Sequence, residues 1–363
     1  MELIDLLKVA VSKRASDLHL IVGVPPVLRI DGEIILADGD PLTPADTERL
    51  ILGTLPEEKI QALAKDLQMC YSMKIPDLGY FRVSIYHEQG ELGAAVRVGM
   101  TQIYSLEELN LPPIAAELTR KPSGLILITG PTGSGKTTTL NSMIDLINRD
   151  RRCKIIMVED PIEYVHPNKR SIIVQQEVHT DTHSFSEALV HILRQDPDVI
   201  AVGEMRDLET IATALTAAET GHLVISTLHT PDASQTVDRI IDVFPPAQQT
   251  QVRMQMATSL QAVISQQLLP RVDKPGRILA TEVMIANAAV RNIIRESKTQ
   301  SLNNVILTSQ SQSMQSMDAS LRDLYQQGII TYDTAMTRAK MPAEMRSLND
   351  RGAAVSTDET GKL

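Results

Sequence analysis

Apolar and polar residues alternate along the first part of the chain in short runs with changing periods. Leu3, Leu6, Leu7 and Ala10 recur at helical spacing, which predicts a helix at the start of the chain. A second helix is expected at residues 44–52, and strands are expected at 17–22, 27–30, 33–36, 81–86 and 94–98. An Asp-Gly pair joins the second and third of these strands and indicates a tight hairpin. The pattern predicts a compact α+β domain over residues 1–100.

A proline-containing stretch follows this domain. Residues 101–113 include Asn110 and the pair Pro112-Pro113, and consecutive prolines remove backbone N–H donors and stiffen the chain. We therefore expect 101–113 to link two domains. A chain of 363 residues is long enough for both.

Continuous apolar runs replace the alternating pattern after Gly124. Strands are expected at 125–129, 154–158, 199–202 and 223–227, and helices at 138–148, 185–194 and 208–220. Apolar strands that alternate with helices are typical of a parallel sheet covered on both faces. The sequence therefore predicts a second domain of the α/β class over residues 114–344.

The last third of the chain has a different pattern. An apolar stripe at helical spacing predicts that the chain is mostly helical after about residue 247. The stripe consists of Val252, Met256, Leu260, Val263 and Ile264. The polar segment 345–363 is expected to be a disordered tail.

Composition argues against nucleic acid as a partner. The net charge is −10 and the pI is about 5.3, so the chain repels phosphate backbones and anionic lipid on average. Aromatic residues make up only 3% of the chain, which leaves few side chains for base stacking.

Cysteine use and hydropathy favour a cytoplasmic protein. Cys70 and Cys153 form no CxxC pair, and we expect them to be reduced, buried thiols. No apolar run reaches the ~18 residues of a membrane span. Glu2 and Asp5 interrupt the apolar N-terminus, which therefore does not resemble a signal peptide. Direct membrane insertion is not expected.

The segment from Gly130 to Thr137 fits the phosphate-binding pattern G-x-x-x-x-G-K-[ST]. Its glycines let backbone N–H groups curl around phosphate oxygens. Lys136 is expected at the β- and γ-phosphates of ATP, and Thr137 is expected to bind Mg²⁺. A helix beginning at Thr138 adds its positive dipole end. The predicted ATP-binding residues are Gly130, Pro131, Thr132, Gly133, Ser134, Gly135, Lys136, Thr137 and Thr138. The alternative, a glycine-rich turn with a chance lysine, does not explain the apolar strand before the motif and the amphipathic helix after it.

Three carboxylates follow the apolar strand at 154–158. Glu159, Asp160 and Glu163 stand just past its end, which is where ligands bind in open α/β sheets. The cluster is predicted to handle Mg²⁺ or water, with Glu163 as a candidate metal contact through water. For any one of these residues, a solvated turn is the alternative.

Glu204 closes the apolar strand at 199–202. This segment resembles a Walker B strand, but Gly203 stands where the Mg²⁺-linked Asp would be. Glu204 is therefore the candidate to orient and polarise the attacking water. The alternative is an ordinary glutamate at a strand end.

Two histidines stand at opposite ends of the strand at 223–227. His229 is at the carboxyl end, on the predicted phosphate side, and is expected to sense the γ-phosphate of ATP. His222 is at the far end, where it is expected to support a loop or a subunit contact. A lone histidine on a strand is more often structural than catalytic, which is the alternative for each.

These segments together resemble the secretion-ATPase superfamily of type IV pili and of type II and type IV secretion. The matching runs are GPTGSGKT, VEDPIEYVH, RQDPDVIAVGEMRD and TAAETGHLVISTLHT, in family order, with SDLHL and PPVLRIDG in the N-terminal part. AAVRNIIRESKT at 288–299 is similar to the AIRNLIRE signature of the PilT-type retraction motors of type IV pili, which fit best. Two departures leave the subfamily open: IIVQQEV at 172–178 has Gln where many relatives have Arg, and residues 308–318 lack the usual glycines.

The resemblance implies a RecA-like P-loop domain with a smaller PAS-like N-terminal domain. It also implies a homohexameric ring with ATP between subunits, in which Arg82 and Arg97 reach the phosphates from the neighbouring subunit. Without the resemblance, each would be interpreted as a surface arginine. It further implies a cytoplasmic motor at the inner-membrane base of the pilus. That motor would drive a platform protein during pilus retraction and twitching motility, coupling hydrolysis to rotation of the PAS-like domain about the linker.

Three alternative functions stay open. A nucleic-acid translocase would need a basic pore, which the acidic composition disfavours. An ATP-binding scaffold with little turnover is disfavoured by the presence of Lys136, Glu204 and His229. An accessory, PilU-like retraction ATPase would work beside a paralogous principal motor.

Overall fold

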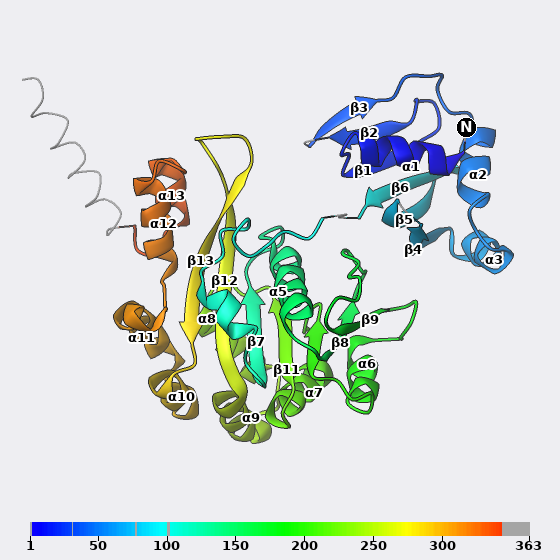
Figure 1. Ribbon diagram of the computed structural model, residues 1–363. Coiled ribbons are helices and arrows are strands. Elements are labelled where there is room, and N and C mark those ends of the chain that lie inside the picture. The colour runs from blue at the N-terminus through cyan, green and yellow to red at the C-terminus, as the bar shows by residue number, and fades with distance from the viewer. Residues whose placement is uncertain (1, 31, 77, 100–101, 343–363) are drawn as a thin grey trace, which may run out of the picture. The chain divides into compact units, whose positions relative to one another are not determined.

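Two compact units make up the chain. The structure is a computed structural model and describes residues 2–342 apart from residues 31, 77, 100 and 101. The first unit comprises Met1–Ile103 and Asp160–His166, and the second comprises Tyr104–Glu159 and Pro167–Leu363. Figure 1 shows a separate sheet in each. Most of the predicted linker thus groups with the second unit, and the predicted tail at 345–363 lies outside the described residues.

The first unit is an antiparallel sheet packed against helices. The strand order is β3-β2-β1-β6-β5-β4, and all neighbouring strands run antiparallel. Its elements are α1 (Leu3–Ser12), β1 (Asp17–Leu20), β2 (Val27–Ile30), β3 (Glu33–Leu36), α2 (Pro44–Leu52), α3 (Glu57–Asp66), β4 (Gln68–Ile75), β5 (Gly79–Glu88) and β6 (Glu91–Val98). Leu3, Leu6, Leu7 and Ala10 are buried in its core, at the predicted helical spacing. The α+β character of this part is confirmed, although the sequence pattern did not predict α3 and β4.

A mainly parallel sheet forms the centre of the second unit. The strand order is β13-β12-β7-β11-β10-β8-β9, and all neighbours run parallel except β12 and β13. The strands are β7 (Gly124–Thr129), β8 (Lys154–Glu159), β9 (Ile172–Glu177), β10 (Val199–Val202), β11 (Leu223–Leu228), β12 (Leu260–Pro270) and β13 (Arg277–Ile285). The predicted α/β class with a mainly parallel sheet is confirmed.

Helices cover both faces of this sheet (Figure 1). They are α4 (Ile114–Leu118), α5 (Lys136–Asp150), α6 (Phe185–Ile192), α7 (Leu208–Glu219), α8 (Ala233–Asp242), α9 (Pro246–Ser259), α10 (Ala288–Arg295), α11 (Leu302–Thr308), α12 (Met317–Gln326) and α13 (Tyr332–Arg338), with 3-10 turns at Thr299–Ser301 and Gln310–Gln312. Successive strand residues point to opposite faces. In β7, Leu125 and Leu127 therefore join the cluster that contains α6 to α9, whereas Ile126 and Ile128 join the cluster that contains α5. Burial on both faces explains why β7 is apolar throughout.

The predicted helical stripe after residue 247 is wrong in its second half. Val252 and Met256 lie on α9, but Leu260, Val263 and Ile264 lie on β12. β12 pairs in parallel with β7 and is mostly buried. An apolar run that is buried on both faces shows no alternation, so periodicity does not separate it from a buried helix.

The expectation that both thiols are buried is also wrong. Cys70 is exposed and Cys153 is half-buried, and both are free. Cys70 lies on β4, which is an edge strand of the first sheet. An edge strand is covered on fewer sides than a central strand, so a small apolar residue there gains less burial.

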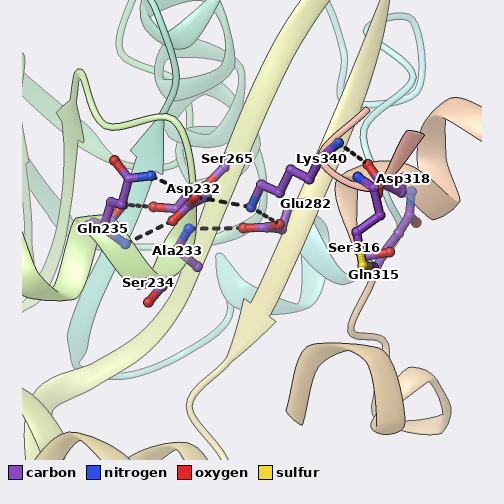
Figure 2. A network of polar contacts seen from close by, with 12 residues as sticks. Asp232, Ala233, Ser234, Gln235, Ser265, Glu282, Gln315, Ser316, Asp318 and Lys340 are labelled. Atoms are coloured by element: carbon purple, nitrogen blue, oxygen red, sulfur yellow. Dashed lines mark hydrogen bonds and ion pairs between the residues drawn. The ribbon is translucent and has the colours of Figure 1, made fainter. Parts of the chain in front are cut away.

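A polar network ties the last described residues to the second sheet (Figure 2). Nζ of Lys340 donates to Glu282 at 2.9 Å and lies 3.2 Å from a carboxylate oxygen of Asp232. The backbone N–H of Lys340 donates to Asp318 at 2.7 Å. Glu282 also accepts from the backbone N–H of Ala233, in the first turn of α8, at 2.9 Å. One lysine therefore balances two buried carboxylates.

Candidate active site

The phosphate-binding loop lies between the end of β7 and the start of α5, which begins at Lys136. Gly130, Gly133 and Gly135 have φ angles of +140°, +77° and +87°, which favour glycine. A Cβ atom at position 130 would lie 2.3 Å from the carbonyl oxygen of Gln266. The loop is therefore tightly curled, and the first turn of α5 places backbone N–H groups beside it. This geometry suits a bound phosphate group.

Lys136 is held inside this loop. Its Nζ donates to the carbonyl oxygens of Gly130 at 2.9 Å and Pro131 at 3.0 Å, and lies 3.4 Å from Nδ1 of His229. Burial lowers the pKa of the Lys136 ammonium, and the nearby charge of Glu204 raises it. The carbonyl oxygens of Gly130 and Pro131 thus accept the hydrogen bonds from Lys136 that phosphate oxygens can accept when nucleotide is bound.

Glu204 lies beside His229 because their strands are neighbours. Glu204 follows β10 and His229 follows β11, and these strands are adjacent and parallel. Oε2 of Glu204 lies 3.3 Å from Nε2 of His229, and Oε1 lies 2.8 Å from Nε of Arg206. The structure therefore brings the predicted residues Lys136, Glu204 and His229 together. It adds Arg206, whose place two residues after Glu204 is the only sequence signal for it.

Glu159 and Thr137 stand at the same edge of the sheet. Glu159 ends β8, is 2% exposed, and accepts a hydrogen bond of 2.9 Å from Gln175 on β9. β8 pairs with β10, so the strand ends that carry Glu159 and Glu204 are adjacent. Thr137 is half-buried in the first turn of α5. Its hydroxyl and these carboxylates offer the oxygen atoms that Mg²⁺ prefers. No group of three or more His, Cys, Asp or Glu side chains among the described residues is spaced to hold a metal ion.

Arg82, Arg97 and Glu163 belong to the first unit. Arg82 on β5 pairs with Arg97 on β6, and both line a cavity of about 190 Å³ together with Glu163. Burial raises the pKa of the Glu163 carboxyl, and Arg97 and Arg82 lower it. Nε of Arg97 also lies 3.1 Å from a carboxylate oxygen of Asp17. The sequence pattern did not predict that residues 160–166 would group with this unit.

His222 holds a turn. Its Nδ1 lies 2.9 Å from the carbonyl oxygen of Ala217 and 3.3 Å from the hydroxyl of Thr220, at the end of α7. These contacts agree with the predicted role of His222 in supporting a loop.

None of the helices among the described residues combines the length and the apolar composition that are needed to cross a bilayer.

Known proteins resemble this chain over nearly its whole length. The family model described as type II/IV secretion system protein matches residues 94–337. The type IV pilus retractation ATPase PilT of Pseudomonas aeruginosa is 42% identical, over 94% of this chain and 99% of its own length. The type IV pilus ATPase PilU of the same organism is 37% identical, over 100% of this chain and 95% of its own length.

A solved structure agrees with this match. The crystal structure of the pilus retraction motor PilT with bound ADP has a TM-score of 0.89 and 46% identity, and covers 95% of this chain and 98% of its own. The match therefore spans both units and includes the phosphate-binding loop. The chain belongs to the type II/IV secretion system protein family.

Proposed function

We propose that this ATPase is a motor that powers type IV pilus retraction and, through it, twitching motility. The observation that carries the proposal is the connected set of Lys136, His229 and Glu204 at the phosphate loop. It occurs in a chain that matches a named retraction ATPase over nearly the full length of both proteins. A chain that only bound nucleotide would not need a carboxylate and a histidine aligned beside the loop lysine.

ATP binds at Gly130–Thr138 in this proposal. The curled loop and the N-terminus of α5 supply N–H donors, and Lys136 can exchange its carbonyl partners for phosphate oxygens. Thr137 would hold Mg²⁺, and Glu159 would assist from the end of β8. Mg²⁺ supplies charge neutralisation at the β- and γ-phosphates when it is bound with ATP.

Glu204 orients and polarises the attacking water. Its ion pair with Arg206 and its contact with His229 fix the direction of the carboxylate before ATP arrives. His229 senses the γ-phosphate, because its Nδ1 lies next to the loop lysine. Glu163 would support the water network and would contact Mg²⁺ through a water molecule. In these assignments Glu204 is the residue that positions the water for attack.

Assembly completes the site. The protein works as a homohexameric ring at the cytoplasmic base of the pilus, where Arg82 and Arg97 reach the phosphates of a neighbouring subunit. Each arginine neutralises charge that develops during phosphoryl transfer. Phosphate loss releases both arginines, so the PAS-like domain, residues 1–100, rotates about the linker at 101–113 relative to the ATPase domain at 114–344. That rotation drives an inner-membrane platform protein, and a paralogous retraction ATPase is a further candidate partner.

A biochemical experiment tests hydrolysis at this site. Glu204→Gln is expected to keep ADP binding within a few-fold and to lose turnover by about 10²-fold or more. Glu209→Gln on the exposed side of α7 is the matched control and should leave both unchanged. Undiminished turnover in the Glu204 variant would remove the catalytic assignment.

A genetic experiment tests retraction. A deletion strain of the organism that carries this chain is scored for surface pili and twitching, and is complemented with wild type or with Glu204→Gln. Excess pili without motility, restored only by wild type, supports a retraction motor. Loss of pili would indicate extension, and unchanged motility with intact pili would favour an accessory role.

A further inference from the structure

Gln266 on β12 lies directly against the phosphate-binding loop. The residue is fully buried, and its Nε2 donates to the carbonyl oxygen of Ser134 at 2.7 Å. β12 pairs with β7 in parallel register, with Ser265 beside Thr129, and the two hydroxyl groups of that pair are 2.7 Å apart. Gln266 therefore follows Ser265 into the loop region just as the loop itself follows Thr129.

Both ends of the loop touch this one residue. A Cβ atom at Gly130 would lie 2.3 Å from the carbonyl oxygen of Gln266, and one at Gly135 would lie 3.4 Å from its Nε2. The backbone of Gln266 thus leaves no room for a side chain at Gly130, and the side chain of Gln266 lies against Gly135. A residue of β12, a strand outside the motif, therefore constrains the backbone of the loop between Gly130 and Gly135.

The chemistry fixes the orientation of the amide. A carbonyl oxygen can only accept, so the nitrogen of the Gln266 amide must face Ser134. Oε1 of Gln266 and Oγ of Ser134 are then buried without a hydrogen-bond partner among the described residues. A buried polar group without a partner is unfavourable. The hydrogen bond that the Gln266 amide donates to Ser134 must therefore offset the cost of its unpaired oxygen.

We propose that Gln266 is a positioning residue for nucleotide binding. By holding the carbonyl group of Ser134, it sets the peptide plane between Ser134 and Gly135 and directs the N–H groups of the loop toward the phosphates. Loss of that donor lets the carbonyl turn toward the phosphate side, where it repels an anion. The inference rests on the proposed nucleotide site at Gly130–Thr138.

The first test measures the affinity for Mg·ADP of the full chain by titration calorimetry. Gln266→Met, which keeps the side-chain length and removes the amide, is expected to weaken ADP binding by about tenfold. Gln267→Met is the matched control: it makes the same change one residue along, on the opposite face of β12, and should bind like wild type. Lys136→Ala tests the site itself and should abolish binding.

A second variant separates positioning from loss of structure. Gln266→Glu presents a carboxylate to the Ser134 carbonyl oxygen at high pH, and a protonated carboxyl, which can donate, at low pH. Its ADP affinity relative to wild type should therefore recover as the pH is lowered from about 8 to about 6. Lys136, the charged group of the loop, is the same in wild type, Gln266→Met and Gln266→Glu. Gln266→Met should show no such recovery.

The role of Gln266 and the nucleotide site at Gly130–Thr138 fail in different ways. Wild-type affinity in Gln266→Met, or an equal loss in Gln267→Met, would overturn the role of Gln266 while Lys136→Ala still confirms the site. If Gln266→Met fails to fold, a pH-independent affinity in Gln266→Glu overturns the role instead. Retained binding in Lys136→Ala would refute the nucleotide site itself.

Discussion

The ammonium nitrogen of Lys136 lies 3.4 Å from Nδ1 of His229, although the two residues are 93 positions apart in the chain. A protonated lysine can only donate, so Nδ1 of His229 accepts in this pair. In a neutral imidazole the proton then sits on Nε2, which faces Glu204 at 3.3 Å. The loop lysine, the histidine and the carboxylate therefore form one directed chain of hydrogen bonds.

The hydrogen bonds that join Lys136, His229 and Glu204 predict how His229 variants behave. His229→Ala is expected to lower kcat by about 10²-fold while ADP binding changes little, because Glu204 loses one of the two groups that hold it. The amide of His229→Gln reaches the position of Nε2, so this variant should retain more turnover than His229→Asn. Steady-state ATPase assays with calorimetric ADP titration measure both quantities. Equal losses in the Gln and Asn variants would show that contact with Glu204 is not what matters.

The paired arginines of the first unit give a second prediction. Arg82→Ala and Arg97→Ala are each expected to reduce kcat by about 10³-fold, since an arginine that stabilises transferred phosphate contributes on that scale. Arg29→Ala is the matched control, because Arg29 lies on β2 of the same sheet. Turnover measured on the assembled protein tests this. Activity in Arg82→Ala equal to that of Arg29→Ala would remove Arg82 from the site.

Glu163 gives a prediction about pH. Burial raises the pKa of its carboxyl above the ordinary value of 4.5, so the folded state favours the protonated form. Its contribution to stability is complete below pH 4.5 and is lost as the pH rises through the raised pKa. Glu163→Gln avoids this loss and should therefore melt at a higher temperature than wild type at about pH 8, with no difference at about pH 4.

Thermal melts of the nucleotide-free protein across this range measure the effect. Glu91→Gln changes an exposed carboxylate of the same unit and should show no such trend. A Glu163→Gln variant that is less stable than wild type at high pH would mean that Arg82 and Arg97 outweigh desolvation.

The sequence predicted the chemistry of the second unit better than its geometry. Lys136, Glu204 and His229 could each be identified because each lies in a recognisable sequence motif that follows or includes an apolar strand. Their contact depends on the strand order, which places β11 between β7 and β10, and strand order is a long-range property that local patterns do not encode. Gln266 gave no signal, because Gln266 and Gln267 stand side by side in an apolar run and the local pattern does not tell which of them faces the phosphate-binding loop.

The segment at 160–166 shows the same limit for the first unit. Its carboxylates stand next to a strand of the ATPase domain in sequence, so local reasoning assigned all of them to that domain. Contacts formed over more than 60 residues of chain group Glu163 with Arg82 and Arg97 instead. Periodicity predicted most of the strands and helices of both units, but only the packing decides which unit a connecting segment joins.

The network around Lys340 gives the last prediction (Figure 2). Lys340→Met leaves Asp232 and Glu282 as two buried like charges without their cation, which is expected to destabilise the second unit by about 1–3 kcal/mol. The value lies below that of a fully buried pair because the Lys340 side chain is 34% exposed. Adding Glu282→Gln should restore part of the loss, since the two sites share one interaction. Urea unfolding measures the free energies.

The matched control for Lys340 is Lys298→Met. The ion pair of Lys298 with Glu296 is exposed to solvent on both sides, so its loss should leave the free energy of unfolding nearly unchanged. The comparison separates the two explanations of why a lysine near the end of the described chain contacts carboxylates. If Lys340 is a cation that the buried acids require, its variant is far less stable than the control, and Glu282→Gln rescues it. If the contact is incidental, both lysine variants unfold alike, and Glu282→Gln in the Lys340→Met background costs further stability because the N–H of Ala233 loses a charged acceptor.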